Sequence, residues 1–243
     1  MVIIASNVIH PDLYELSRDS YNDFPVEKRI ISGEGGLYGL SFFEKAVKEF
    51  TDADWMIYID EDCFISDLSA VFDLLVYQIT NNIHFSGMPD GGVISHRFHN
   101  PVSINPFFTI INLKWVREQY HTYNRENRYS DDLVTHTPKH LLKKNFFNKD
   151  CYNDIVDSGY TPFGVSYDNF EPYYNFFFWM LRQGANCLYL DADDTDIDCL
   201  TTVLYNHKCV PFAYHTWFAR SWDNPKNKER IVNVSNVVKK NRP

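Results

Sequence analysis

Five consecutive apolar residues, from Trp55 to Ile59, run directly into the acidic triplet Asp60-Glu61-Asp62. An uninterrupted apolar run of this length is typical of a strand buried on both faces of a mostly parallel sheet. Such sheets bind ligands beyond the carboxyl ends of their strands, which is where the two aspartates stand. Carboxylate oxygens suit Mg²⁺ or Mn²⁺ shared with substrate phosphates, so the triplet predicts a cation site. The alternative is a strand-to-loop junction with solvated acids.

Strand and helix patterns alternate along the first third of the chain. Strand candidates lie at 2–5, 29–32 and 55–59, and helix candidates at 11–21, 43–50 and 67–82. Asp67 stands near the start of the last helix, whose apolar positions are Leu68, Val71, Leu75 and Ile79. This alternation favours βαβ units, and the predicted fold class is therefore α/β with a mostly parallel central sheet flanked by helices.

The pattern changes beyond this region. Strand candidates follow at 83–85, 93–98 and 107–112 and, after a polar stretch at 112–161, at 186–190. Helical spacing recurs at Tyr174, Phe177, Phe178 and Leu181. Pro172 suits the first turn of this helix and Gly184 its end. We interpret the acidic stretch 191–198 as a surface loop.

Composition and charge limit the partners. The chain has 243 residues, 44% hydrophobic and 23% charged, which is ordinary for a globular protein. Aromatic residues reach 16%, enough to supply both core and platforms for sugars or bases. The formal net charge of −9 argues against a nucleic-acid partner. A phosphate ester would need a cation to mask the acidic site.

The cysteines and termini indicate a cytoplasmic protein. Five scattered cysteines without C-x-x-C spacing read as reduced thiols. The first residues look like a strand rather than a signal peptide, and no apolar run is long enough to span a membrane. A lysine cluster is either a solvated helix face or a peripheral contact with the inner face of a membrane or a lipid-linked acceptor: Lys139, Lys143, Lys144 and Lys149.

Three further segments carry candidate residues. The first is a glycine-rich turn with Gly33, Gly35, Gly36 and Gly39, which matches neither a dinucleotide fingerprint nor a P-loop. In the second, Asp168 and Glu171 precede the helix opened by Pro172, where a capping role is the alternative. In the third, His215 and Arg220 lie among aromatic residues; an imidazole can bind a metal and a guanidinium can bind phosphate.

In this order, the pieces resemble a nucleotide-sugar-dependent glycosyltransferase of the GT-A fold, which has a Rossmann-type sheet and a smaller acceptor-side region. Asp60 and Asp62 match the D-x-D motif that holds the metal, and His215 matches a late metal ligand. Glu171 matches the catalytic base, although Pro172 follows where the motif usually has Asp, which leaves Asp168 as a substitute. The segment HTWFARSW resembles the closing motif of bacterial members that act on surface polysaccharides.

The resemblance implies a single domain, with a nucleotide-sugar-binding half at 1–90, an acceptor-side half at 91–222 and a C-terminal tail at 223–243. It implies a UDP- or GDP-sugar donor, a saccharide or lipid-linked acceptor, and Mn²⁺ or Mg²⁺ on the ligands Asp60, Asp62 and His215. The donor would contact Asp60, Arg220 and the loop with Gly35, Gly36 and Gly39. Secondary candidates for sugar or acceptor contacts are His96, Arg97 and Asn112. The expected reaction is an inverting displacement at the anomeric carbon.

Two alternatives remain open. Asp191-Ala192-Asp193 follows a strand-like segment and resembles the nucleophile motif of haloacid-dehalogenase-type phosphatases. Only 48 residues follow Thr195, which is short for the rest of such a core. The other alternative is a catalytically inactive carbohydrate-binding module, because fold does not fix function.

Overall fold

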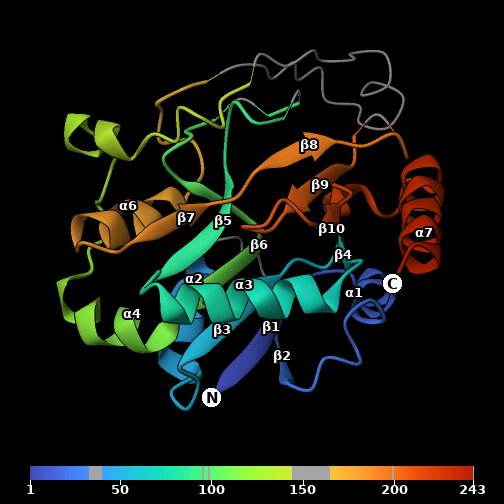
Figure 1. Cartoon of the computed structure of the whole chain (residues 1–243), viewed down its shortest axis with the longest axis horizontal. Coiled ribbons are helices and arrows are strands. Elements are labelled where there is room, and N and C mark those ends of the chain that lie inside the picture. The colour runs from blue at the N-terminus through green and yellow to red at the C-terminus, as the bar shows by residue number, and fades with distance from the viewer. Residues whose placement is uncertain (33–39, 95, 98, 144–164, 199, 243) are drawn as a thin grey trace.

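A central six-stranded sheet organises the computed structural model, which describes residues 1–32, 40–94, 96–97, 99–143, 165–198 and 200–242 (Figure 1). Its order is β2-β1-β3-β6-β5-β7, and β6 alone runs antiparallel to its neighbours. The strands are β1 Val2–Val8, β2 Glu27–Ser32, β3 Trp55–Ile59, β5 Phe85–Pro89, β6 Ile104–Asn112 and β7 Cys187–Tyr189. The predicted α/β class with a mostly parallel sheet is confirmed, and it is consistent with a GT-A-like Rossmann-type fold.

A second, four-stranded sheet is antiparallel throughout and has the order β4-β10-β9-β8. Its strands are β4 Cys63–Ile65, β8 Ala192–Asp194, β9 Thr202–Tyr205 and β10 Pro211–His215. The expectation of an acidic surface loop at 191–198 is therefore wrong in part, because β8 pairs with β9 along Ala192–Asp194. The sequence alone does not indicate that β9 would pair with this segment.

Helices cover both faces of the central sheet, with α2 Leu40–Glu49, α4 Leu113–Gln119 and α6 Tyr174–Arg182 on one face and α3 Leu68–Thr80 on the other. Two further helices, α1 Pro11–Arg18 and α7 Pro225–Lys240, pack together against β4. Short 3₁₀ turns lie at η1 Tyr120–Thr122, η2 Asp131–His136 and η3 Ala219–Ser221. Along β3, Met56 and Tyr58 pack with α2, α4 and α6, whereas Ile57 and Ile59 pack with α3 and the second sheet. Two buried faces explain why this strand is apolar at every position.

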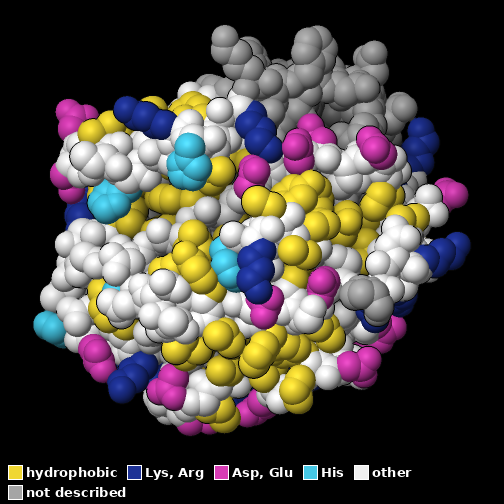
Figure 2. Space-filling model, viewed as in Figure 1, with side chains coloured by type: hydrophobic (Ala, Val, Ile, Leu, Met, Phe, Trp, Pro, Cys, Tyr) yellow, Lys and Arg dark blue, Asp and Glu magenta, His cyan; other side chains and the backbone are white. Residues whose placement is uncertain are grey.

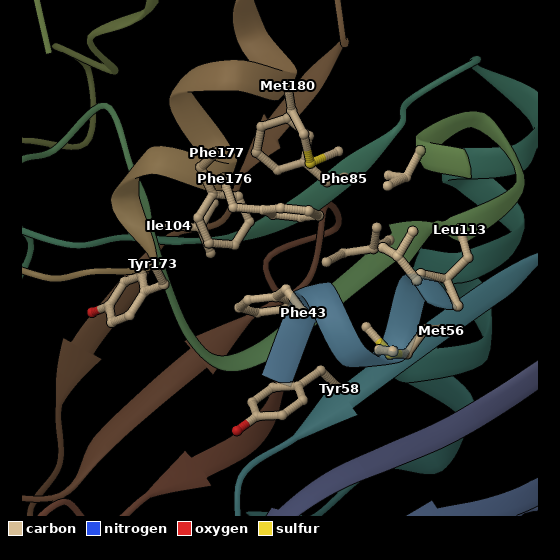
Figure 3. Close-up of a cluster of buried hydrophobic side chains, with 14 of the residues drawn as sticks. Phe43, Met56, Tyr58, Phe85, Ile104, Leu113, Tyr173, Phe176, Phe177 and Met180 are labelled. Carbon is tan, nitrogen blue, oxygen red and sulfur yellow. The ribbon is translucent and has the colours of Figure 1, made fainter. Parts of the chain in front are cut away.

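Helix α6 is buried on all sides, from Tyr174 to Leu181. It packs its phenylalanines against Phe43 of α2 and Phe85 of β5 (Figure 3). The helix ends as predicted, because Gly184 adopts a φ of +80° just beyond it. In Figure 3 the hydroxyl groups of Tyr58 and Tyr173 point away from the other rings of this cluster. Both tyrosines therefore belong to the core and to the site described below.

Helix α3 begins as predicted, because the Asp67 side chain accepts hydrogen bonds from the N–H groups of Ser69 and Ala70. Its buried face includes Val71 and Leu75 but not Ile79, which is 50% exposed. Together with two neighbours, Ile79 gives α3 an apolar outer face (Figure 2): Phe72, Val76 and Ile79. Periodicity predicted the helix but overestimated the width of its buried stripe.

Residues 223–243, expected as a tail, contain the sixteen-residue helix α7. The side chain of Asn224 caps its first turn, and Pro225 occupies the first helical position. Ile231, Val234 and Val238 pack in a small core with residues of α1 and β4. This helix is therefore an integral part of the molecule.

The connection from β5 to β6 also differs from expectation. A strand was expected at 93–98, but Val93, Ile94, His96 and Arg97 belong to no strand. The chain folds back on itself here, since a Cβ on Gly91 would lie 2.0 Å from the carbonyl oxygen of His99. This turned loop carries polar groups into the site.

Within the described part of the chain, no helix combines the length and apolar character needed to cross a membrane. Cys63, Cys187 and Cys209 form no disulfide, and Cys151 and Cys199 lie outside the described residues.

Candidate metal and substrate site

Asp60, Asp62 and His215 converge, with one potential ligand atom from each lying within 4.8 Å of the other two. Asp60 follows the last residue of β3, and the chain turns directly into β4. Strand β10 pairs antiparallel with β4 and places His215 opposite Cys63. This pairing of β10 with β4 brings Asp62 and His215 together, although they are 153 positions apart in the chain. The site lies where the central sheet meets the second sheet.

Several contacts fix the orientation of His215. Its Nε2 lies 3.0 Å from Oδ1 of Asp62. The next residue, Thr216, donates from its N–H and its hydroxyl to the Asp62 carbonyl, at 3.0 Å each. The imidazole stacks on Phe107, with ring centroids 4.3 Å apart, and contacts Trp217 on another side. These contacts hold the imidazole beside the two carboxylates.

The two carboxylates create a demand for a cation. Burial, together with the negative charges of Asp62 and Glu61, raises the pKa of Asp60 well above its usual value. Oδ2 of Asp62 is buried and has no hydrogen-bond partner among the described residues. Buried carboxylate oxygens are normally paired or bound to metal. The donor set of two carboxylates and one imidazole therefore fits a divalent cation.

The middle residue of the motif, Glu61, has a different role. Its Oε2 accepts hydrogen bonds from the N–H groups of Ile9 and His10, both at 2.8 Å. Burial raises the pKa of Glu61 to about 7. Glu61 thus ties the segment after β1 to the motif.

A cavity of about 260 Å³ joins the three ligands to other predicted residues. Glu171 and Arg220 line it, and so do His96 and Arg97. Its other lining residues are Asn7, Ile9, Tyr58, Glu61, Asn105, Pro106, Pro172, Tyr173, Trp217, Phe218 and Ala219. The structure therefore brings most of the predicted site residues into one cavity.

Asp90, the residue that follows β5, is a further buried carboxylate and was not among the predicted site residues. It is fully buried and accepts hydrogen bonds from Arg97 Nε (2.6 Å), Arg97 Nη2 (3.1 Å) and Asn105 Nδ2 (2.7 Å). The hydroxyls of Tyr173 and Tyr174 also donate to it, at 3.0 and 2.5 Å. The signal was a carboxylate after a buried strand, as at Asp60, but the predicted strand ended at residue 85.

Arg97 links this buried carboxylate to Glu171. Its Nη2 donates to Oε1 of Glu171 at 3.0 Å. Burial raises the pKa of Glu171 above its usual value, and the positive charge of Arg97 offsets part of that effect. Glu171 precedes α6 by three residues, and Pro172, which was expected in the first turn, also lies before the helix, because α6 begins only at Tyr174. A partly buried carboxylate with a raised pKa suits proton transfer.

The segment after β10 forms one wall of the cavity. Trp217 and Phe218 both adopt a φ of +61°, the left-handed region that bulky residues rarely occupy. Arg230 of α7 donates to the carbonyls of Thr216 and Trp217, at 2.6 and 3.2 Å. Arg220, in η3, places its guanidinium 5.7 Å from the centre of the Phe218 ring. Such strained segments persist only where the surrounding structure holds them.

Other predicted residues lie elsewhere. Asp168 does not line the cavity, and its Oδ1 accepts a hydrogen bond from the N–H of Phe170. Asn112 is the last residue of β6 and caps α4. It pairs with Trp55, the first residue of β3, and so lies at the opposite end of that strand from Asp60. Gly35, Gly36 and Gly39 lie outside the described residues.

The remaining acidic pair forms local ion pairs with one residue of the lysine cluster. Asp191 and Asp193 form ion pairs with Lys143, at 3.1 and 3.2 Å, and neither aspartate lines the cavity. Lys144 and Lys149 lie outside the described residues. The geometry therefore gives the phosphatase alternative no support.

No family model and no curated protein matches the sequence. Among solved structures, the chain is similar to the protein A197 from STIV, with 14% identity and a TM-score of 0.35 over 60% of this chain and 80% of that one. It is also similar to a glycosyltransferase involved in the glycosylation of the major capsid of PBCV-1, with 10% identity and a TM-score of 0.33 over 68% and 81%. Because both TM-scores are below 0.5, these similarities assign no function to this chain.

Proposed function

We propose that this protein is a metal-dependent glycosyltransferase. It would move a sugar from a UDP- or GDP-sugar to a hydroxyl of a saccharide or lipid-linked acceptor, with inversion at the anomeric carbon. The observation that supports this most is the convergence of Asp60, Asp62 and His215 in a cavity that also contains Glu171. A cation site and a candidate base within one cavity are the parts that this reaction needs.

The roles follow from position and charge. Asp60, Asp62 and His215 would hold Mn²⁺ or Mg²⁺, which supplies positive charge for the departing nucleoside diphosphate. Arg220 would bind the same phosphate oxygens, since it lines the cavity and a guanidinium pairs well with phosphate. Glu171 would accept the proton of the acceptor hydroxyl. We assign the base to Glu171 because Asp168 lies outside the cavity.

The first test is binding. Thermal unfolding would be measured with UDP and with GDP, each with and without Mn²⁺. We expect one nucleotide to raise the midpoint only when Mn²⁺ is present, and Asp62→Asn to abolish that shift. Asp193→Asn is the matched control, because it alters the other D-x-D sequence, which lies outside the cavity. Stabilisation that does not depend on metal would contradict the proposal.

The second test is turnover. With Mn²⁺, wild-type protein should release the nucleoside diphosphate from one nucleotide sugar in a panel of UDP- and GDP-sugars. Release of inorganic phosphate from phosphomonoesters would instead support a phosphatase. Binding of nucleotide sugar without transfer to water or to an acceptor would identify a carbohydrate-binding module.

A further inference from the structure

His96 lines the cavity with an imidazole that has no hydrogen-bond partner among the described residues. The residue is 3% exposed, and both ring nitrogens are buried. Its nearest acidic atom, Oδ1 of Asp194, lies 3.9 Å from Nδ1, which is beyond hydrogen-bond length. Leaving a buried polar group without a hydrogen bond destabilises a protein. A ligand bound in the cavity could supply the hydrogen bonds that this imidazole lacks.

The surroundings of His96 place it beside the metal-binding residues. Its ring meets Trp217 edge to face, with centroids 5.0 Å apart. On other sides the same indole contacts His215, at 4.3 Å between centroids, and the guanidinium of Arg97, at 5.4 Å. Trp217 is itself held by a hydrogen bond from its Nε1 to Thr202 Oγ1, at 2.8 Å. His96 is therefore fixed in position relative to the predicted cation.

The chemistry of a neutral imidazole selects the group it binds. Burial, with a smaller contribution from the positive charge of Arg97, lowers the pKa of His96 to about 3. The ring is therefore neutral near pH 7 and offers one N–H donor and one acceptor nitrogen. A phosphate oxygen can use only the donor and a cation only the acceptor, whereas a hydroxyl group can use both. So weak a base is also unsuited to take the proton of the acceptor, a role that remains with Glu171.

We propose that His96 binds substrate by hydrogen bonding a sugar hydroxyl of the nucleotide sugar, on either the transferred sugar or the ribose. This inference rests on the proposed function and adds a specificity-determining residue to it. His96 is not one of the three proposed metal ligands, which are Asp60, Asp62 and His215.

The test compares His96→Leu and His96→Gln with wild-type protein by calorimetric titration in the presence of Mn²⁺. The probes are the nucleotide sugar found in the turnover screen, its nucleoside diphosphate, and the 2′,3′-dideoxy form of that diphosphate. Loss of a neutral hydrogen bond of about 1 kcal/mol predicts about fivefold weaker binding of the nucleotide sugar to His96→Leu. His96→Gln, which keeps a donor and an acceptor, should recover most of the affinity.

The probes distinguish the two sources of the hydroxyl. A loss confined to the nucleotide sugar assigns the transferred sugar, and a loss shared by the nucleoside diphosphate but absent for its dideoxy form assigns the ribose. Affinity for Mn²⁺ alone should be unchanged. His84→Leu is the control, because His84 is a buried histidine outside the cavity.

Three results would overturn the inference while leaving the proposed function intact. These are unchanged affinity of His96→Leu for the nucleotide sugar, a loss that persists with the dideoxy probe, and an equal loss of Mn²⁺ affinity. If wild-type protein binds none of the nucleotide sugars, the proposed function itself fails, and this assignment fails with it.

Discussion

The side chain of Asp62 combines two opposing demands at the scale of a single residue. One carboxylate oxygen shares a hydrogen bond with His215, and the other is buried without a partner among the described residues. Such an arrangement is unfavourable in the protein without metal, because a buried charge lacks full compensation. It becomes favourable when a cation supplies the missing contact. Asp62 should therefore favour metal binding at the expense of stability without metal.

Asp62→Asn separates these two effects. We expect Mn²⁺ affinity to fall by at least about 100-fold. Mutation of a residue that only hydrogen-bonds to a metal ligand already lowers metal affinity by about 10–100-fold. Without metal, the unfolding midpoint should stay the same or rise, because an amide is easier to bury than a carboxylate. Titration calorimetry and thermal unfolding in chelator measure the two quantities. Wild-type Mn²⁺ affinity in the variant would show that Asp62 is not a ligand.

Glu171 should determine the acid side of the pH–rate profile. Only its carboxylate form can accept a proton, so kcat/KM should fall as pH decreases through the pKa of Glu171. That pKa is raised by burial, so the fall should occur above pH 4.5, the usual pKa of a glutamate. Glu171→Gln should lower kcat by about 10²–10⁴-fold and remove this limb of the profile. A variant with undiminished kcat would exclude Glu171 as the base.

At the scale of elements, α7 supports the cavity wall although none of its residues lines the cavity. Its Arg230 pairs with Asp198 at 2.9 Å and also holds the carbonyls of Thr216 and Trp217. Both partners of the ion pair are largely buried. Burial raises the pKa of Asp198, but Arg230 and two backbone N–H groups outweigh that effect and leave it below the usual value. Arg230 is thus a positioning residue for the strained segment that follows His215.

Arg230→Met tests this support. Breaking a buried ion pair typically costs about 3–5 kcal/mol, so the free energy of unfolding in urea should fall by that order. Mn²⁺ affinity should also fall, because His215 is followed directly by the segment that Arg230 holds. Lys239→Met on the same helix is the control, since the exposed pair with Asp19 is worth about 0–1 kcal/mol. Equal effects of the two variants would contradict a special role for Arg230.

The loop between β5 and β6 depends on the pair of Asp90 and Arg97. Arg97→Met should cost about 3–5 kcal/mol, because it leaves the fully buried Asp90 without its cation. The double variant Asp90→Asn with Arg97→Met should recover part of this loss, since no unpaired charge remains. A double-mutant cycle by urea unfolding measures the coupling. Additive losses would show that the two side chains do not act as a pair.

These elements also show what sequence could and could not predict. The strand Trp55–Ile59 and its aspartates were predictable, because burial on both faces leaves an uninterrupted apolar run. The place of His215 beside them was suggested by resemblance alone, since pairing of β10 with β4 is not encoded locally. The loop after Asp90 was misread as a strand because Val93 and Ile94 are buried for tertiary reasons. Arg230 carried no local signal, because its partners lie in other elements.

At the scale of the whole molecule, the candidate site joins two sheets that are otherwise separate hydrogen-bonded units. The sheets share a hydrophobic core, with Ile57 and Ile59 of β3 in one cluster with Phe212 and Ala213 of β10. The proposed cation ligands lie at the edge of that core, with Asp60 after β3 and His215 at the end of β10. A bound cation would therefore connect the central sheet to the second sheet. Its effect on stability should extend through both.

Hydrogen exchange measures this coupling. At 100 times its dissociation constant, Mn²⁺ should stabilise the protein by about 2.7 kcal/mol. In wild-type protein we expect slower exchange of amides in both β3 and β10. In His215→Ala, residual Mn²⁺ binding by Asp60 and Asp62 should slow exchange near β3 and leave β10 unaffected. If Mn²⁺ protects β3 alone in the wild type, His215 is not a ligand. In that case the cation does not join the two sheets, and the second sheet contributes only its aromatic side chains to the cavity wall.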